Sequence, residues 1–412
     1  MASSNIIQWN CRSLKANIDE ISLLIRDHLP VAFCLQETFL KENDSVSFKY
    51  HSMYNKVYTE GDKAQGGVSI IINNCVPHSQ ITLNTTLQAV AVRVSIHNSI
   101  TLCSIYLPPR EPIDINKLNN LITQLPAPYI LAGDFNGHNI IWGCDDTNHR
   151  GTQLEHIITS NDLSIMNHVN SKTYLHPATG SYSSLDLSIC SPTLLPDFDW
   201  KVCDDTCGSD HFPIFISSTS PSSYKRPRKW KLSKADWKKF KLTCEQTITC
   251  EKFNDCDDAS HLFTSLIIDA AKQSIPQTSP NPKHPEKPWY NEECKRATQS
   301  RKEALRKFNM RPTQDNLNNF RVLRAKARRT IKNNKRKSWR QYVSKLNSRA
   351  SLKKTWNMVR KIKGKSQPPI SHLSVDNTKI DTQDKIADAL ADAFAKKSSS
   401  QNCSTNFQKK QN

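Results

Sequence analysis

Short apolar and β-branched runs recur through the first half of the chain, and many of them end or begin at a polar residue. Such runs occupy residues 6–9, 31–35, 67–72, 89–96, 100–105 and 129–132, and two more follow the polar residues of LDLSI and HFPIFI. Apolar residues at helical spacing lie between some of these runs, at residues 14–29 and 115–122. Many strands with few helices between them predict an α/β fold, a four-layered α/β sandwich of two packed β-sheets flanked by helices.

The strand pattern stops after residue 217. The Ser- and Pro-rich stretch STSPSSYKRPRKW follows, and a second Pro-containing break, SQPPI, precedes the Ala-rich segment KIADALADAFAKK. Between them, residues 291–346 have a helical composition dense in Lys and Arg. We therefore predict a sandwich domain in residues 1–217, a linker with short helices in 218–288, a basic helical connector in 289–365, and a break, a short helix and a disordered tail in 366–412.

Charge is divided unevenly between the two halves. Residues 1–217 hold 13 basic and 21 acidic side chains, a net charge of −8, whereas residues 218–412 hold 44 and 17, a net charge of +27. A basic segment of this size attracts polyanions through counterion release, which makes nucleic acid the expected partner. An anionic membrane surface fits less well, because the basic segment lacks a sustained apolar face.

The 13 cysteines include no C-x-x-C pair, and the closest two, Cys203 and Cys207, lack histidines at zinc-finger spacing. The pattern predicts reduced thiols in an intracellular protein. No apolar run approaches the ~18 residues of a membrane span, and the first residues do not resemble a signal peptide.

Polar side chains at the strand ends are the candidate chemistry. They are Asn10, Glu37, Tyr106, Asp134, Asn136, Asp186, Asp210 and His211. Neighbouring strand ends of a sheet converge, and carboxylates with amide oxygens are ligands that suit Mg²⁺. An Asp followed by His offers an imidazole whose charge a carboxylate can hold. The combination predicts metal-assisted attack of water on a phosphate ester. Each motif alone is also typical of an Asx-turn or a helix cap.

The joint order of the motifs carries a resemblance. QWNCRSL, QETFL, YLPP, AGDFNGHNIIWG, SSLDLSI and GSDHFPI occur in this order. They resemble the successive motifs of the endonuclease/exonuclease/phosphatase superfamily, specifically the apurinic-type endonuclease of jockey-like non-LTR retrotransposons. The resemblance covers about residues 5–217.

This resemblance implies roles for the strand-end residues. Glu37 is the main ligand of Mg²⁺, or of Mn²⁺ in its place, and Asn10 supports the metal side. Asp134 orients or deprotonates the attacking water. Asp186 and Asp210 position the remaining groups, and Asp210 pairs with His211, which stabilises the charge that develops on the phosphate.

The resemblance also implies phosphate contacts. Tyr106 and Asn136 contact the scissile phosphate, and Thr173 matches a phosphate-contacting threonine, a role for which Ser183 and Ser184 compete. One position departs from the superfamily: repair enzymes resemble WNxDG where this chain has WNCRS, so that Arg12 replaces an acidic group. A cation there is compatible with phosphate binding and disfavours abasic-site repair.

The second half resembles the basic connector that precedes the reverse transcriptase in retrotransposon polyproteins, in the segments WYNEECKRA and KIADALADAFA. No Y-x-D-D motif occurs, so a reverse transcriptase domain is expected downstream but absent, and the chain looks like a truncated reading frame. Basic residues of the connector are predicted to bind DNA or element RNA: Arg328, Arg329, Lys335, Arg336, Lys337 and Arg340.

Aromatic residues among these cations have two open interpretations. Trp339, Tyr342 and Trp356 suit stacking on bases. Alternatively, Trp339, Tyr342 and Leu346 form one apolar helix stripe that packs on the missing polymerase.

The sequence as a whole predicts a Mg²⁺-dependent DNA endonuclease that acts in the nucleus and leaves a 3′-hydroxyl primer for target-primed reverse transcription. Three alternatives remain: an abasic-site repair nuclease, an inositol-phosphate or sphingomyelin phosphoesterase, and a catalytically idle nucleic-acid-binding relic. Because every predicted reacting group precedes the linker, catalysis at saturating DNA is expected to need nothing from residues 225–412.

Overall fold

The computed structural model describes residues 5–96, 98–219, 230–248, 256–277, 287–345, 373–375, 378–380 and 383–398. Contacts divide the chain into two units: Ser3–Ser223 with Glu286–Asn412, and Met1–Ala2 with Tyr224–Pro285. Most of the first Pro-rich stretch, all of SQPPI, and Leu346 and Trp356 lie outside the described residues. The four-part division expected from the sequence stays a prediction.

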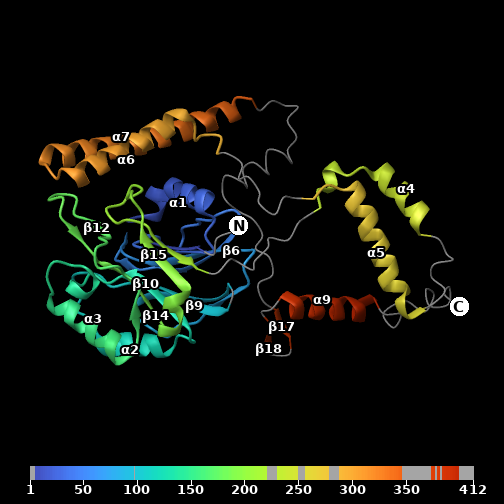
Figure 1. Ribbon diagram of the computed structural model, residues 1–412, viewed down its shortest axis with the longest axis horizontal. Coiled ribbons are helices and arrows are strands. Elements are labelled where there is room, and N and C mark those ends of the chain that lie inside the picture. The colour runs from blue at the N-terminus through green and yellow to red at the C-terminus, as the bar shows by residue number, and fades with distance from the viewer. Residues whose placement is uncertain are drawn as a thin grey trace. The chain divides into compact units, whose positions relative to one another are not determined.

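Two six-stranded sheets form the centre of the larger unit (Figure 1). The first sheet has the order β15-β16-β1-β2-β6-β3, with β15 at Phe198–Val202, β16 at Ile214–Ser218, β1 at Asn5–Asn10, β2 at Ala32–Gln36, β6 at Val68–Asn73 and β3 at His51–Lys56. Strand β1 runs parallel to β2 and antiparallel to β16. Both β1 and β2 therefore deliver their carboxyl ends to the same edge.

The second sheet has the order β11-β14-β10-β9-β8-β7. Its strands are β11 at Ser164–Ile165, β14 at Asp186–Cys190, β10 at Tyr129–Asp134, β9 at Ser99–Tyr106, β8 at Gln88–Ser95 and β7 at His78–Ile81. Strand β10 is parallel to β9 and antiparallel to β14. The end of β9, the end of β10 and the start of β14 thus lie side by side.

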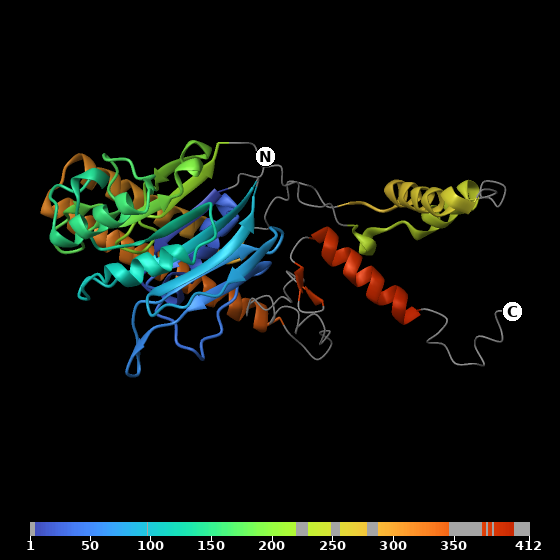
Figure 2. The same cartoon turned by 90° about the horizontal axis from the view of Figure 1, so that it is seen from below.

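Helices cover the outer faces of both sheets. Between the sheets lies an apolar core to which β1, β6, β8 and β16 all contribute, and Figure 2 shows the same strands turned by 90°. Helix α1 (Leu14–His28) packs on the other face of the first sheet, and α2 (Ile115–Thr123) and α3 (His149–Ser160) pack on that of the second. The layers run helix, sheet, sheet, helix, which confirms the predicted four-layered sandwich.

Polar side chains also link the two sheets inside this core. The Gln8 amide of β1 donates to the carbonyls of Gly133, at 3.0 Å, and Leu187, at 3.2 Å. In return, the Ser188 hydroxyl donates to the side-chain oxygen Oε1 of Gln8 at 2.7 Å. Gln36 of β2 donates to the Ser104 hydroxyl at 2.9 Å. Because all of these groups are buried, each bond satisfies a polar atom that would otherwise be costly to bury.

Two long helices follow in the same unit, and we call α6 (Glu292–Met310) and α7 (Gln314–Val343) the helical hairpin. They run side by side (Figure 1). Asn291 and Thr313 cap their first turns by accepting backbone N–H groups. Apolar residues of the hairpin and of the sandwich share one buried cluster: Leu175, Phe212, Ala304, Leu305, Phe308, Leu317 and Phe320.

The remaining elements are small or peripheral to the site. In the larger unit they are β4 (Thr59–Glu60), β5 (Lys63–Ala64), β12 (Tyr174–Leu175), β13 (Tyr182–Ser183), β17 (Leu373–Val375), β18 (Thr378–Ile380), α9 (Gln383–Ser398) and the 3₁₀ helices η1 (Ile140–Trp142) and η2 (Pro192–Asp197). The other unit contains η3 (Leu232–Lys234), α4 (Trp237–Thr247) and α5 (Cys256–Ser274). No helix among the described residues has both the length and the apolar character needed to cross a membrane.

One strand begins later than the sequence predicts. The expected strand HFPIFI does not start at His211, because β16 begins only at Ile214. His211 instead forms an isolated bridge with Tyr174 of β12. Pro213, which has no backbone N–H, separates the two pairings. This break lets His211 face a different part of the sheet edge from the strand that follows it.

Candidate active site

Strand pairing by itself brings the predicted acidic residues together. Asp134 at the end of β10 stands opposite Asp186 at the start of β14 and opposite Tyr106 at the end of β9. In the first sheet, Asn10 at the end of β1 stands opposite Gln36, the residue before Glu37. One edge of each sheet therefore supplies polar side chains to a common candidate site.

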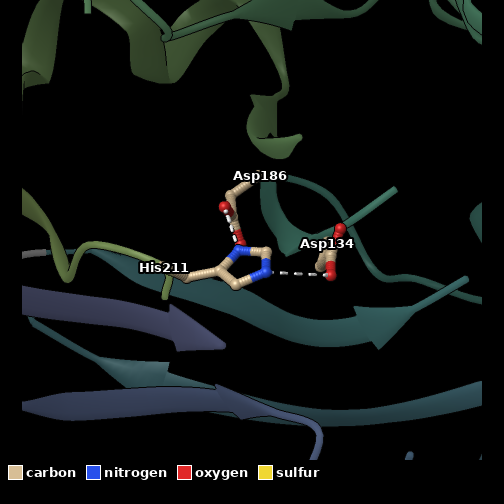
Figure 3. A group of neighbouring side chains, drawn as sticks. All are labelled: Asp134, Asp186 and His211. Carbon is tan, nitrogen blue, oxygen red and sulfur yellow. Dashed lines mark hydrogen bonds and ion pairs between the residues drawn. The ribbon is translucent and has the colours of Figure 1, made fainter. Parts of the chain in front are cut away.

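At the centre of the candidate site is a buried group of Asp134, Asp186 and His211 (Figure 3). His211 Nδ1 lies 2.8 Å from Asp186 Oδ2, and His211 Nε2 lies 4.0 Å from Asp134 Oδ2. The candidate ligand atoms of the three side chains lie within 4.8 Å of one another.

Electrostatics set the charge state of this group. Burial opposes a charged imidazole, but Asp186, Asp134 and Asp210 together raise the pKa of His211 to about 10. Burial also raises the pKa of Asp134 to about 8, against the pull of His211 and with the help of Asp186 and Glu37. His211 is thus held as a cation, which is a donor and not a metal ligand.

The predicted pairing of His211 with Asp210 is wrong. Asp186, and not Asp210, accepts the hydrogen bond from His211. Asp210 instead forms an ion pair with Arg12. The reason is geometric, because Asp210 lies in a bend directly before the isolated bridge of His211, and its carboxylate is turned to Arg12.

Asn10 joins the two sheets at the site. Its side-chain N–H₂ group donates to Glu37 Oε1 at 2.9 Å and to Asp134 Oδ2 at 2.7 Å. Burial, followed by the carboxylates of Glu37 and Asp134, holds the pKa of the Tyr106 phenol far above its usual value. Glu37, Asn10 and Asp134 therefore form one hydrogen-bonded group, with Tyr106 beside it.

This group fits a hard divalent cation. Glu37 and Asp186 both act on Asp134 to raise its pKa, which shows negative charge gathered in a small volume. Asp186 Oδ1 is buried and has no hydrogen-bond partner, a costly state for a carboxylate oxygen unless a cation or donor reaches it. Carboxylate oxygens are the donors that Mg²⁺ and Mn²⁺ accept.

Three of the predicted residues have a strained backbone. Arg12, Glu37 and Asn136 have φ values of 42°, 47° and 51°, in the left-handed region that few non-glycine residues adopt. Each follows the end of a site-forming strand. Such conformations persist where the surrounding structure imposes them, often at functional sites.

The predicted phosphate-contacting residues have internal partners. The Thr173 hydroxyl accepts the N–H groups of Leu185 and Asp186, each at 3.1 Å, and the Ser184 hydroxyl donates to the Ser171 carbonyl at 2.9 Å. Both side chains are fully buried. Asn136 donates to the Leu107 carbonyl at 3.2 Å, and its own N–H bonds Asp134 Oδ1 at the same distance. Their contacts with a phosphate stay predictions.

The predicted basic residues divide by face. Lys335 is ion-paired with Asp19 of α1, so it holds the hairpin against the sandwich. The other five are exposed along α7: Arg328, Arg329, Arg336, Lys337 and Arg340. Trp339 is also exposed and stacks on Tyr342 with ring centroids 5.8 Å apart, which leaves both interpretations of this aromatic pair open.

Several supporting residues escaped the sequence analysis. Trp9 donates to the His211 carbonyl at 2.9 Å, and the Ser209 hydroxyl donates to the Asn10 carbonyl at 2.8 Å. Arg150 binds the carbonyls of Phe135 and Leu107, which follow β10 and β9. Trp9 and Ser209 lie inside the quoted motifs and could have been proposed from them, whereas no local pattern marks Arg150.

Comparison with known proteins gives consistent relatives. Residues 100–215 match the family model described as "Endonuclease-reverse transcriptase". The chain is 25% identical over 278 residues to the RNA-directed DNA polymerase from mobile element jockey of Drosophila melanogaster, an alignment covering 65% of this chain and 30% of that protein. It is 23% identical over 290 residues to a probable RNA-directed DNA polymerase from transposon X-element of the same species, covering 68% and 32%.

Solved structures give similar names. The endonuclease domain of TRAS1, a telomere-specific non-LTR retrotransposon, is 22% identical, with a TM-score of 0.46 over 52% of this chain and 98% of that one. An AP endonuclease of Leishmania major is 13% identical, with a TM-score of 0.45 over 53% and 89%.

The chain spans about a third of the length of its curated relatives. The motif order of residues 5–217 and the family match of residues 100–215 both indicate an endonuclease-type domain. The resemblance predicted from the motifs is therefore confirmed: the chain is similar to the RNA-directed DNA polymerases of the mobile element jockey and of transposon X-element, and its residues 100–215 match the endonuclease-reverse transcriptase family model.

Proposed function

We propose that this protein is a divalent-metal-dependent DNA endonuclease of a non-LTR retrotransposon, which nicks target DNA to give a 3′-hydroxyl primer. The observation that carries the proposal is the buried group of Asp134, Asp186 and His211 beside Glu37 and Asn10. The relatives support this activity and do not favour the repair, lipid-phosphate or idle-relic alternatives.

Mg²⁺, or Mn²⁺ in its place, is the proposed cofactor, with Glu37 as its main ligand and Asn10 beside it. When bound there, such an ion supplies Lewis-acid stabilisation of negative charge on the phosphate. Glu37 is only partly buried, so its carboxylate can be reached from solvent, whereas Asp134 and Asp186 are each 1% exposed.

Asp134 is proposed to orient the attacking water and, in its ionised form, to deprotonate it. Because burial raises the pKa of Asp134 to about 8, the ionised form gains population as pH rises through that value. Asp134 Oδ2 accepts from Asn10 and its Oδ1 from the Asn136 N–H, which fixes the orientation of the carboxylate. The oxygen of water forms a bond to phosphorus while the bond from phosphorus to the 3′-oxygen breaks. The water proton passes to Asp134, and the departing 3′-oxygen takes a proton from solvent. The products are a 3′-hydroxyl and a 5′-phosphate.

His211 is the proposed charge stabiliser. Asp186 accepts from Nδ1 at 2.8 Å, which leaves Nε2–H as the free donor on the side of Asp134. A fixed cationic donor close to the reacting phosphate stabilises the charge that develops in the transition state. Tyr106 and Asn136 are proposed to contact the phosphate, with Arg12 close by through its ion pair with Asp210.

The exposed basic face of α7 is the proposed contact with DNA, or with element RNA. Five cations on one helix can neutralise several phosphates, which the mildly acidic sandwich cannot do. A reverse transcriptase domain is the proposed partner in the complete polyprotein, because the matched relatives are named as polymerases. The nucleus is the proposed place of action.

Nicking of a supercoiled plasmid tests the proposal. The full chain should convert it to the open circle with Mg²⁺ or Mn²⁺ and not in EDTA, and a DNA polymerase should extend the nick. Asp134→Asn should reduce the rate by at least ~10². Asp145→Asn is the matched control, since Asp145 is 85% exposed in a neighbouring loop, and should nick at the parental rate. Undiminished nicking in EDTA, or nicks that cannot be extended, would contradict the proposal.

A further inference from the structure

The segment that carries Asp210 and His211 is held from outside the sandwich. We call residues 203–212, between β15 and β16, the catalytic segment. Three of its residues contact the helical hairpin or share a buried cluster with it: Asp205, Ser209 and Phe212. The hairpin follows this segment by about 80 residues in the sequence, so these are long-range contacts.

The first contact is a buried ion-pair triad. Arg301 of α6 is 1% exposed and donates to Glu20 Oε1 of α1 and to Asp205 Oδ2, both at 2.6 Å. Asp205 is fully buried as well. Buried carboxylates beside an arginine fork make short, charge-assisted bonds with fixed geometry. Removing the arginine would leave two buried charges without their partner.

The second contact lies next to the reacting groups. Arg324 of α7 donates to the Ser209 carbonyl at 3.0 Å, directly before Asp210. The Ser209 hydroxyl donates to the Asn10 carbonyl, so the same residue links the hairpin to the proposed metal side. Arg324 thus acts on the backbone of the site and not on a side chain.

The third contact is apolar. Phe212 follows His211 and is 5% exposed in a cluster that contains Leu305 and Phe308 of α6 and Leu317 of α7. Tyr182 of β13 joins them, with ring centroids 6.3 Å from Phe212 and 6.2 Å from Phe308. The residues on both sides of the Asp210 and His211 pair are therefore fixed by the hairpin.

We propose that the helical hairpin is a working part of the nuclease and that Arg301 is a positioning residue, which fixes the catalytic segment through Asp205. The inference rests on the proposed endonuclease function. It reverses the expectation that residues 225–412 are dispensable for catalysis at saturating DNA. Small displacements of a reacting group are costly, since a shift of about 1 Å can reduce a rate by ~10².

Kinetics of the full chain separate positioning from DNA binding. Arg301→Gln should lower kcat by roughly 10-fold to 10² and leave the KM for DNA unchanged, because a side chain that is 1% exposed cannot reach the substrate. Arg306→Gln is the matched control. Arg306 lies on the same helix but is exposed, so its variant loses the same charge and should keep the parental kcat.

A second variant covers the case in which Arg301→Gln does not fold. Arg324 is only partly buried, so Arg324→Gln should keep the thermal transition of the parent and still lower kcat by roughly 3- to 10-fold. If Arg301→Gln folds, a parental kcat in that variant would overturn the inference. If Arg301→Gln does not fold, a parental kcat in Arg324→Gln would overturn it. An effect on KM alone would overturn it too.

Amide hydrogen exchange gives a readout that does not depend on activity. Residues 203–212 should exchange faster in Arg301→Gln than in the parent, whereas α2 and α3 should not change. In Arg324→Gln the increase should be confined to the same segment. If the parent itself fails to nick DNA, the proposed function fails, and exchange alone decides the inference: unchanged protection of residues 203–212 would refute it.

Discussion

Asp186→Asn is the most informative single change at the site, because it alters the charge next to His211 without removing a side chain. Asp186 Oδ2 lies 2.8 Å from His211 Nδ1, and both residues are buried. After burial, Asp186 is the largest influence on the pKa of His211 and raises it, to about 10 with the help of Asp134 and Asp210. An asparagine amide keeps the size of the group and loses its charge.

The expected effect follows from titration. Without Asp186, burial is opposed only by the two remaining carboxylates, so the pKa of His211 should fall well below about 10. Each pH unit above the lowered pKa reduces the protonated fraction of the imidazole, and with it the nicking rate, about tenfold. Below that pKa the imidazole stays charged, so the loss at the acid end of the pH range should be small.

Single-turnover nicking between pH 6 and pH 9, at saturating metal ion, measures this dependence. The rate of the variant relative to the parent should fall steadily as pH rises, because the imidazole of His211 loses its proton at a lower pH in the variant than in the parent. Asp199→Asn, an exposed carboxylate on β15, is the control and should follow the parental profile. A variant whose deficit is the same at every pH would refute the assignment of His211 as a cationic stabiliser held by Asp186.

Two further predictions concern the metal and the basic face. Glu37→Gln should raise the Mg²⁺ concentration needed for half-maximal nicking sharply, because an amide keeps one ligand oxygen and loses the charge; an unchanged metal titration would remove Glu37 as main ligand. Replacing Arg329, Arg336 and Arg340 with Gln should reduce the slope of log affinity against log salt by about 0.9 for each phosphate that the variant no longer neutralises. An unchanged slope in binding isotherms would mean that this face serves a protein partner.

Strand-level reasoning predicted the sandwich and the meeting of Asp134 with Tyr106 and Asp186, because apolar runs mark buried strands and the strand ends share an edge. It did not predict the partner of His211. That partner depends on Pro213 delaying β16 and on which way two adjacent side chains point. Such local rotations leave no trace in a pattern of apolar positions.

The long-range ion pairs could not be predicted from the sequence for the same reason. Arg301 and Asp205 are 96 residues apart, and nothing distinguishes Arg301 from the exposed arginines around it until the helix is docked. Lys335 and Arg336 are neighbours in a basic run, yet one pairs with Asp19 and the other is exposed. The rotation of α7 about its axis decides this, and apolar packing against the sandwich sets that rotation.

The polar links inside the core have a consequence for engineering. Gln8 and Ser188 link the two sheets through buried hydrogen bonds. Replacing buried polar groups with apolar ones is often neutral or stabilising, but it can remove the specificity of an arrangement. Asn10 and Asp134 come from different sheets and depend on that arrangement. Selection for heat resistance alone could therefore yield more stable variants in which the two sheets shift relative to each other and the proposed nuclease activity is lost.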